Sequence, residues 1–161
     1  MVDEASLYKM MLSVGEYEGF VASIARQWIG TPYVHQASQK GVGSDCLGLV
    51  YGIWRELYRE EPISIPPYSQ DWGESGGGDC LLDAVSLYFD RVTLRRSISP
   101  GQVLVFRMRR GSIAKHLGVV GQGDPQATFI HSHTGRGVHE TALSSAWRQR
   151  IAGRFIFPPP N

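Results

Sequence analysis

The chain has little of what defines several large classes of protein. It contains only two cysteines, Cys46 and Cys80, so it is no disulfide scaffold, although a single bridge between them would use up both thiols. Its 16 basic and 15 acidic residues nearly cancel, so nucleic acid is not an expected partner. No apolar run approaches the length of a transmembrane helix, and membrane insertion is not expected.

The N-terminus also lacks the charged start and apolar run of a secretory signal. We therefore expect a polypeptide made in the cytoplasm that would need another carrier to work outside. At 161 residues the chain suits one sizeable core. We expect a single domain over 1–161, with an N-terminal extension over 1–17 and a frayed tail over 158–161.

Hydrophobic periodicity divides the chain into helices followed by strands. Apolar residues recur at helical spacing before Gly30 and Pro32, and again after Ser44 or Asp45, either of which is suited to cap a helix. We expect helices over 18–29, 46–58 and 81–89, and strands over 103–108, 113–120, 127–132 and 151–157. The inner face of the second helix would comprise Leu47, Val50, Tyr51, Trp54 and Leu57. This order predicts an α+β fold with helices packed on an antiparallel sheet. The proline- and glycine-rich connection over 62–78 is of the kind that borders a cleft.

Cys46 stands where a nucleophile would be placed, in the first turn of the second predicted helix. An ordinary cysteine, with a pKa of about 8.5, is only a few per cent thiolate at neutral pH. The unpaired N–H groups and the dipole of a helix N-terminus favour an anion, so we expect a bias toward thiolate. Such a nucleophile needs a histidine partner.

Three histidines are candidates for that partnership. His116 lies in the middle of an apolar strand, where its ring needs a partner. It is either a base for Cys46 or a ring satisfied by backbone carbonyls. His131 ends the next strand, within reach of His116, and would orient it. His133 has the same strand parity and is the alternative, whereas His139 is expected on an exposed hairpin.

Other chemistries find less support in the residue pattern. No Cys-x-x-Cys or His-x-x-x-His pair is present, so neither a metal site nor a cofactor is expected. Cys80 is expected to be a structural or incidental thiol. Ser132, Ser144 and Ser145 lack the Gly-x-Ser-x-Gly setting of a serine nucleophile.

Five motifs together resemble the NlpC family of cell-wall cysteine peptidases. In chain order they are Gly30-Thr31-Pro32-Tyr33, Asp45-Cys46-x-Gly48-Leu49-Val50, Ser99-Pro100-Gly101-Gln102-Val103-Leu104-Val105-Phe106, His116-Leu117-Gly118-Val119-Val120 and Phe129-Ile130-His131. Their order and spacing agree from about Phe20 to Pro158, which makes the resemblance specific.

The resemblance implies a papain-like fold and hydrolysis of peptidoglycan stem peptides, commonly at the bond between D-glutamate and a diamino acid. It makes Cys46 the nucleophile, His116 the base and His131 the orienting residue. It also implies that Tyr33 positions the substrate or stabilises the oxyanion, and that Asp45 helps to hold a substrate amine. Leu47 and the segment Val34-His35-Gln36 depart from the family pattern at the cleft, which puts the usual substrate preference in doubt.

The compact form resembles members encoded with phage tails and gene transfer agents. A phage-like particle, with its tail proteins as partners, would then carry the enzyme to the wall. Two other readings remain: a structural tail-tip protein with little turnover, and a thiol amidase or acyltransferase acting on another substrate. The absence of a basic amphipathic segment counts against a lipid substrate.

Overall fold

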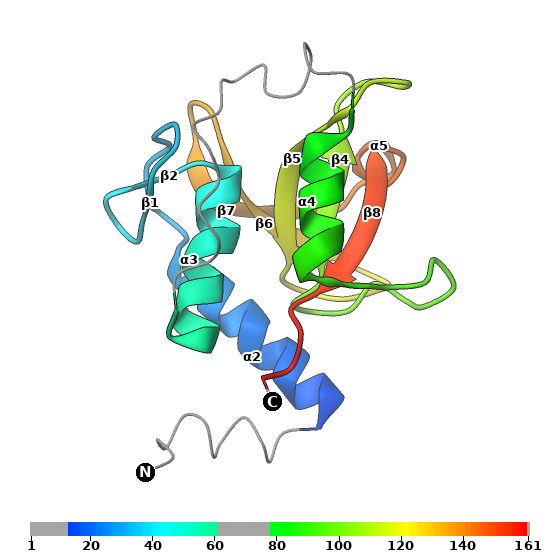
Figure 1. The fold of residues 1–161 in the computed structure, drawn as a ribbon, viewed down its shortest axis with the longest axis horizontal. Helices are drawn as coiled ribbons and strands as arrows, with labels where there is room; N and C mark the ends of the chain where they lie inside the picture. The colour runs from blue at the N-terminus through cyan, green and yellow to red at the C-terminus, as the bar shows by residue number, and fades with distance from the viewer. Residues whose placement is uncertain (1–12, 61–77, 161) are drawn as a thin grey trace.

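A computed structural model describes residues 13–60 and 78–160 of the chain (Figure 1). Its helices are α2 (Val14–Gln27), α3 (Cys46–Tyr58), α4 (Cys80–Tyr88) and α5 (Ser145–Arg148). Its strands are β1 (Ser38–Gln39), β2 (Gly43–Ser44), β3 (Asp90–Arg91), β4 (Val103–Arg107), β5 (Ala114–Val120), β6 (Thr128–His133), β7 (Gly137–Ala142) and β8 (Ile151–Ile156). The strands β3-β8-β4-β5-β6-β7 form one antiparallel sheet in that order, and β1 pairs with β2. The predicted α+β class is confirmed.

Helix α2 begins four residues before the predicted start. Ser13 and Glu16 form a capping box, in which the Ser13 hydroxyl accepts from the Glu16 N–H and the Glu16 carboxylate accepts from the Ser13 N–H. Part of the predicted N-terminal extension therefore belongs to the helix, while residues 1–12 lie outside the described range. The helix ends at Gln27, just before Gly30, which adopts a φ of 93°.

Helix α3 has the predicted bounds and is capped by Asp45 rather than Ser44. Its buried face differs from the prediction, because Leu49 and Ile53 are completely buried whereas Tyr51 and Trp54 are only partly buried. The helix is covered on more than one side: α2 crosses it so closely that a Cβ on Gly52 would stand 1.9 Å from the Trp28 ring. An amphipathic pattern cannot reveal such two-sided burial.

The sheet confirms the four predicted strands to within one or two residues and adds β7 and β3. Strand β7 was missed because its His139, Glu140 and Thr141 give no apolar alternation. It pairs along the whole length of β6, with Thr128 opposite Ala142 and His133 opposite Gly137. His139 therefore lies in a strand and not on the exposed hairpin that was predicted.

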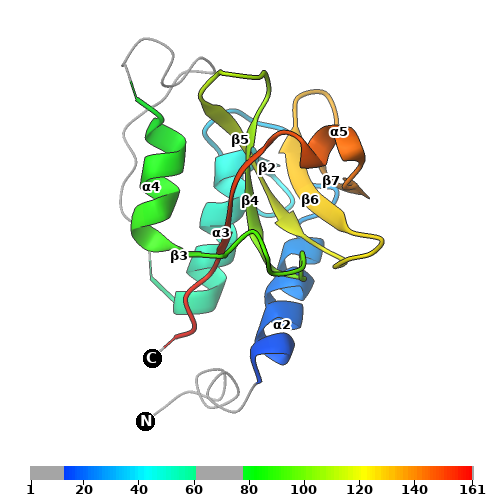
Figure 2. The same cartoon turned by 90° about the vertical axis from the view of Figure 1, so that its right-hand side faces the viewer.

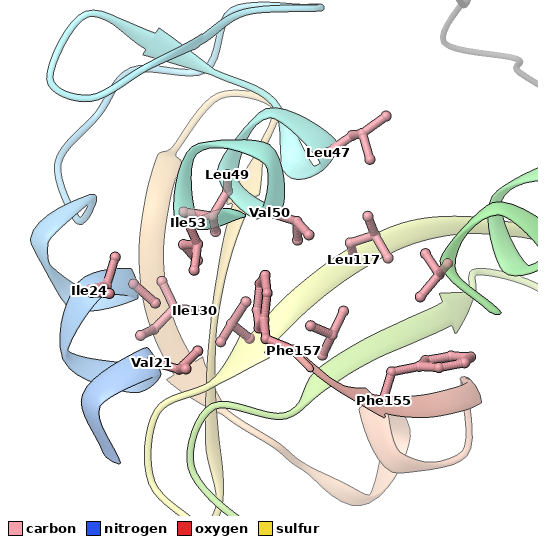
Figure 3. Packing of buried hydrophobic residues seen from close by; sticks show 14 of the residues in the cluster. Val21, Ile24, Leu47, Leu49, Val50, Ile53, Leu117, Ile130, Phe155 and Phe157 are labelled. Atoms are coloured by element: carbon pink, nitrogen blue, oxygen red, sulfur yellow. The ribbon is translucent and has the colours of Figure 1, made fainter. Parts of the chain in front are cut away.

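The two faces of the sheet bury different clusters. Helices α2, α3 and α4 cover one face (Figures 1 and 2), where side chains such as Leu49, Ile53, Leu117 and Phe157 form the main core (Figure 3). On the other face a smaller cluster joins Phe106, Phe129 and Leu143 to Trp147 of α5, which lies beside β6 and β7 (Figure 2). Within β6, Phe129 belongs to the smaller cluster and its neighbour Ile130 to the main core.

The end of the described chain is held to the helices. The Pro158 carbonyl accepts hydrogen bonds from the hydroxyls of Tyr17 (3.1 Å) and Tyr58 (2.6 Å), so the expected fraying does not include Pro158. The connection over 62–78 lies outside the described residues except for Gly78. None of the helices in the described ranges combines the length and apolar character that crossing a membrane requires.

Candidate active site

Cys46 is the first residue of α3 and lies against strand β5. The β5–β6 ladder consists of the pairs Val119–Ile130 and Val120–Phe129. Leu117 precedes this ladder, and its backbone N–H is directed at the Cys46 sulfur. Because Leu117 follows His116 in the strand, this contact brings the helix start to the segment that carries the predicted base.

Asp45 fixes the start of the helix. Its Oδ1 accepts from the Gly48 N–H and its Oδ2 from the Gln36 N–H, both at 2.7 Å, and the side chain is almost fully buried. His35 Nδ1 lies 3.8 Å from Oδ2. Both carboxylate oxygens are thus engaged inside the protein, which assigns Asp45 the role of joining the segment after Tyr33 to the first turn of α3.

The surroundings of the thiol do not produce the expected bias toward thiolate. Burial, the largest cause, and the Asp45 carboxylate together raise the pKa of Cys46 to about 12, although the N–H groups of Leu117, Leu47 and Cys46 itself act in the opposite direction. Burial and an anionic cap thus outweigh the benefit of the helix N-terminus. Cys46 therefore rests as a protonated thiol. Cys80 is also a free thiol and is exposed, so no disulfide joins it to Cys46.

His116 and His131 form a buried pair. The distance from His116 Nε2 to His131 Nδ1 is 2.7 Å, and the two rings meet edge to face. Burial lowers the pKa of His116 to about 3, helped by His133 and His139; it lowers the pKa of His131 to about 2, helped most by His116. Both rings are therefore neutral at rest, and one must donate to the other.

The remaining histidines surround this pair. His133 is exposed at the end of β6, with its ring 6.1 Å from those of His116 and His131, and its Nδ1 donates to the Thr134 carbonyl. His139 lies directly opposite His131 in β7, with ring centroids 4.5 Å apart. His131 is thus the histidine hydrogen-bonded to His116.

Tyr33 lies near the start of α3 because its segment pairs with the residue two positions before Cys46. Tyr33 forms a parallel bridge with Ser44, and the Ser44 N–H donates to the Pro32 carbonyl at 3.0 Å. Burial raises the pKa of the Tyr33 phenol, whereas a hydrogen bond with Thr134 of the β6–β7 hairpin opposes this rise. The phenol therefore lies between the helix start and that hairpin.

A further hydrogen bond ties the two halves of the site together. The Ser132 hydroxyl donates to the Ser44 carbonyl at 2.6 Å, and both residues are buried. It links β6, next to His131, to the segment before Cys46. From the sequence we considered Ser132 only as a nucleophile, and this role was not predicted; the position of Ser132 next to His131 in a strand is the signal that could have suggested it.

Residues 30–155 match the model of the NlpC/P60 family. The chain belongs to the NlpC/P60 family of cysteine peptidases. It is 31% identical over 137 residues to murein DD-endopeptidase MepH of Escherichia coli (strain K12), a match that covers 83% of this chain and 44% of that protein. The chain thus spans less than half the length of this relative.

Solved structures agree on the fold. NlpC2 of Trichomonas vaginalis superposes with a TM-score of 0.62 at 17% identity, over 93% of this chain and 49% of that one. The NlpC/p60 domain of the peptidoglycan hydrolase SagA superposes with a TM-score of 0.53 at 16% identity, over 86% of this chain and 97% of the domain. The predicted papain-like NlpC/P60 fold is confirmed.

The two departures from the NlpC/P60 pattern have different structural settings. Leu47 is buried in the main core, where it packs at the start of α3. Gln36 adopts a φ of 61°, a left-handed conformation that favours glycine. Its N–H is the donor to Asp45, so this unusual backbone belongs to the site.

Metal chemistry has no support in the described part of this NlpC/P60 chain. Among residues 13–60 and 78–160, no group of three or more His, Cys, Asp or Glu side chains is arranged to hold a metal ion. The four histidines of β5, β6 and β7 contact one another through their rings rather than converging on one point.

Proposed function

We propose that the protein is a cysteine endopeptidase that hydrolyses peptide bonds in peptidoglycan stem peptides. The observation that carries this proposal is the hydrogen-bonded His116–His131 pair in strands whose neighbouring residue Leu117 directs its N–H at a thiol at a helix start. Family membership and the similarity to a murein endopeptidase support the substrate class.

In this proposal Cys46 is the nucleophile, His116 the general base and His131 the residue that orients it. His116 can accept the thiol proton at Nδ1 when Nε2 carries the other proton and donates it to His131 Nδ1. The orienting hydrogen bond therefore selects the tautomer that the base needs. His131 then carries its own proton on Nε2.

The reaction starts from a neutral pair, because burial disfavours both thiolate and imidazolium. As Sγ attacks the substrate carbonyl, the thiol proton moves to His116 Nδ1, and His116 then gives it to the leaving amine as the C–N bond breaks. Water hydrolyses the acyl-enzyme: its proton passes to His116 and returns to the thiol. No co-reactant besides water is needed.

Charge that develops on the carbonyl oxygen needs donors beside Cys46. The Cys46 N–H belongs to the first turn of α3, whose N–H groups have no partner within the helix. The Tyr33 hydroxyl, near enough to Cys46 to interact with it electrostatically, supplies a second donor or positions the substrate in this proposal. For Asp45, contact with a substrate amine remains a prediction of the resemblance, and the two engaged oxygens leave little of the carboxylate for it.

Two bonds in peptidoglycan are candidates for cleavage. The resemblance points to the bond between D-glutamate and a diamino acid, whereas the name of the Escherichia coli relative indicates a bond between two D centres. Carriage by a phage-like tail also remains a prediction of the resemblance, as do the alternatives of a structural tail-tip protein and of an amidase or acyltransferase.

Mass spectrometry of purified muropeptides tests the proposal and names the bond. Wild type, Cys46→Ala and the matched control Cys80→Ser are incubated with monomeric and cross-linked muropeptides under reducing conditions. We expect products from wild type and Cys80→Ser only: shortened stems if the bond lies within a stem, monomers from dimers if it lies in a cross-link. Products from Cys46→Ala would refute the nucleophile, and an inert Cys46 thiol without products would favour the structural alternative.

A further inference from the structure

Trp147 contacts the histidine pair from the opposite side to the helices. It belongs to the short helix α5, which lies beside β6 and β7 (Figure 2). Its ring centroid is 5.9 Å from that of His116 and 5.5 Å from that of His131. The same indole packs on Phe106 at 5.1 Å and on Phe129 at 5.0 Å.

Phe106 and Phe129 complete an aromatic enclosure around the two imidazoles. Phe106 is the cross-strand partner of His116, with ring centroids 6.0 Å apart. Phe129 lies 4.3 Å from His131 on the same face of β6. Both phenylalanines are completely buried, whereas Trp147 is only partly buried and therefore separates this enclosure from solvent.

The indole is held from both sides of its short helix. The Ser144 hydroxyl accepts from the Trp147 N–H and caps α5, and the Arg150 guanidinium lies 5.2 Å from the indole centroid. The Arg150 carbonyl also accepts from the Arg107 N–H at 2.7 Å, which joins this turn to strand β4. The position of Trp147 is therefore coupled to the strand beside β5.

His131 makes this enclosure necessary. Within the described residues, its Nε2 is a buried polar atom without a hydrogen-bond partner. The His131 ring therefore has one hydrogen bond, to His116. A single hydrogen bond does not stop the ring from rotating about the line that joins the two nitrogens. Contact with neighbouring rings must supply the rest of the orientation.

We propose that Trp147 is a positioning residue for the proposed peptidase reaction: its indole covers the His116–His131 hydrogen bond and keeps water away from it. The inference rests on the proposed function. Excluding water strengthens that hydrogen bond and stops solvent from competing for the imidazole nitrogens. Trp147 itself touches neither the thiol nor the scissile bond in this scheme.

Other charged groups around the pair affect the expected pH dependence. His133 of β6, His139 of β7 and Arg136 of the intervening hairpin all disfavour imidazolium. Cys46 contacts the backbone of Leu117, the residue after His116, as a neutral thiol, and Arg150 lies 5.2 Å from the centroid of the indole. Removing Trp147 leaves these charges in place and hydrates the pair, so the pKa of His116 should rise toward its ordinary value.

The test compares Trp147→Leu and Trp147→Phe with Leu143→Ala. Leu143 is buried in the same cluster, so its truncation controls for general loosening of that face. One readout is the acid limb of kcat/KM against pH. The other is ¹⁵N NMR titration of the histidine side chains, which needs no activity and separates failure of this inference from failure of the proposed function.

We expect Trp147→Leu to move the acid limb and the His116 titration upward by about one pH unit, a tenfold loss of kcat/KM at pH values on that limb. Trp147→Phe keeps a ring in the enclosure, so its shift should be smaller and in the same direction; it carries the test if the leucine variant does not fold. Leu143→Ala should lose stability without moving either titration. Unshifted titrations in every folded Trp147 variant, or an equal shift in Leu143→Ala, would overturn the proposal.

Discussion

Replacing Gly48 with alanine would place a methyl group in the contact between helix α3 and the segment that follows Tyr33. A Cβ on Gly48 would stand 1.9 Å from the Ala37 carbonyl oxygen, whereas ordinary van der Waals contact begins at 3.4 Å. The same Cβ would lie 3.1 Å from Asp45 Oδ1. The obstacle is mostly backbone, which cannot move away as the end of a flexible side chain can.

The backbone around Ala37 is itself fixed. The Ala37 carbonyl accepts from the Asp45 N–H, the Ser38 hydroxyl donates to the Gly48 carbonyl at 2.5 Å, and Arg55 donates to the Ser38 hydroxyl at 2.7 Å. Relief of the clash must therefore break several of these hydrogen bonds. Overpacking of this kind costs about 1–3 kcal/mol.

A second glycine in a helix supplies the matched control. Gly19 lies in α2, and a Cβ there meets nothing within 4 Å. Gly19→Ala should stabilise the protein by about 0.5–1 kcal/mol through helix propensity alone. Because both substitutions gain the same propensity, the difference in unfolding free energy between them isolates the clash, and we expect about 1–3 kcal/mol.

Urea denaturation of both variants measures this difference, and the rate of Cys46 alkylation in a Cys80→Ser background reports the effect on the site. We expect Gly48→Ala to be the less stable protein and to alter the alkylation rate, and Gly19→Ala to leave that rate unchanged. Equal stability of the two variants would show that the Ala37 backbone yields freely, and the reasoning about a fixed loop would be refuted.

Three further expectations follow from the buried site. The profile of kcat/KM against pH should be bell-shaped and broad, with its acid limb below pH 6.5 and its alkaline limb above pH 9.0. The reason is that burial lowers the pKa of His116 and raises that of Cys46. Activity that still rises at about pH 10 would contradict this expectation. The folded state lowers the pKa of both histidines, so the unfolded chain binds more protons below pH 6.5. The free energy of unfolding should therefore fall below pH 6.5 by about 1.4 kcal/mol per pH unit for each histidine that folding keeps neutral. Urea curves at pH 7 and pH 5 measure this slope, which should be smaller in His131→Gln; an unreduced slope would count against the pair as its source. Ser132→Ala should lower the free energy of unfolding by about 1 kcal/mol and lower kcat more than it raises KM, because the Ser44 carbonyl, two residues before Cys46, loses its donor. The control is Ser86→Ala on the exposed face of α4. Equal kinetics of the two variants would argue against a positioning role for Ser132.

The sequence predicted those parts of the fold whose signals are local. Helix α3 and strands β4, β5, β6 and β8 follow from apolar periodicity, and Asp45 is a recognisable cap. Strand β7 could not be predicted in this way, because its polar residues are stabilised by pairing with β6 rather than by burial of an apolar face. The burial of Leu49 and Ile53 also depends on which helices cover α3.

In the candidate site, too, local motifs support predictions, whereas properties that depend on the folded surroundings do not follow from the sequence. Its motifs predict Cys46, His116 and His131 as the catalytic residues, and strand parity leaves His133 as a rival to His131; in the structure His131 is the one hydrogen-bonded to His116. The pKa of Cys46 could not be predicted from its place at a helix start, since the deciding influences are burial and the charge of its own cap. Trp147 belongs to a short helix that carries no recognisable motif, and only its ring contacts connect it to the histidines.

The adjacency of His131 and Ser132 in β6 constrains how such a chain can change. His131 contacts His116, Ser132 contacts the segment before Cys46, and the pleat directs the two side chains to opposite faces. Inserting or deleting a single residue inside β6 would exchange those faces and undo both contacts at once. Changes of length are instead tolerable in the turns that flank the strand, for example between Val120 and Thr128. Relatives that keep the chemistry should therefore differ in the spacing from His116 to His131 and still keep a small hydroxyl residue directly after the second histidine.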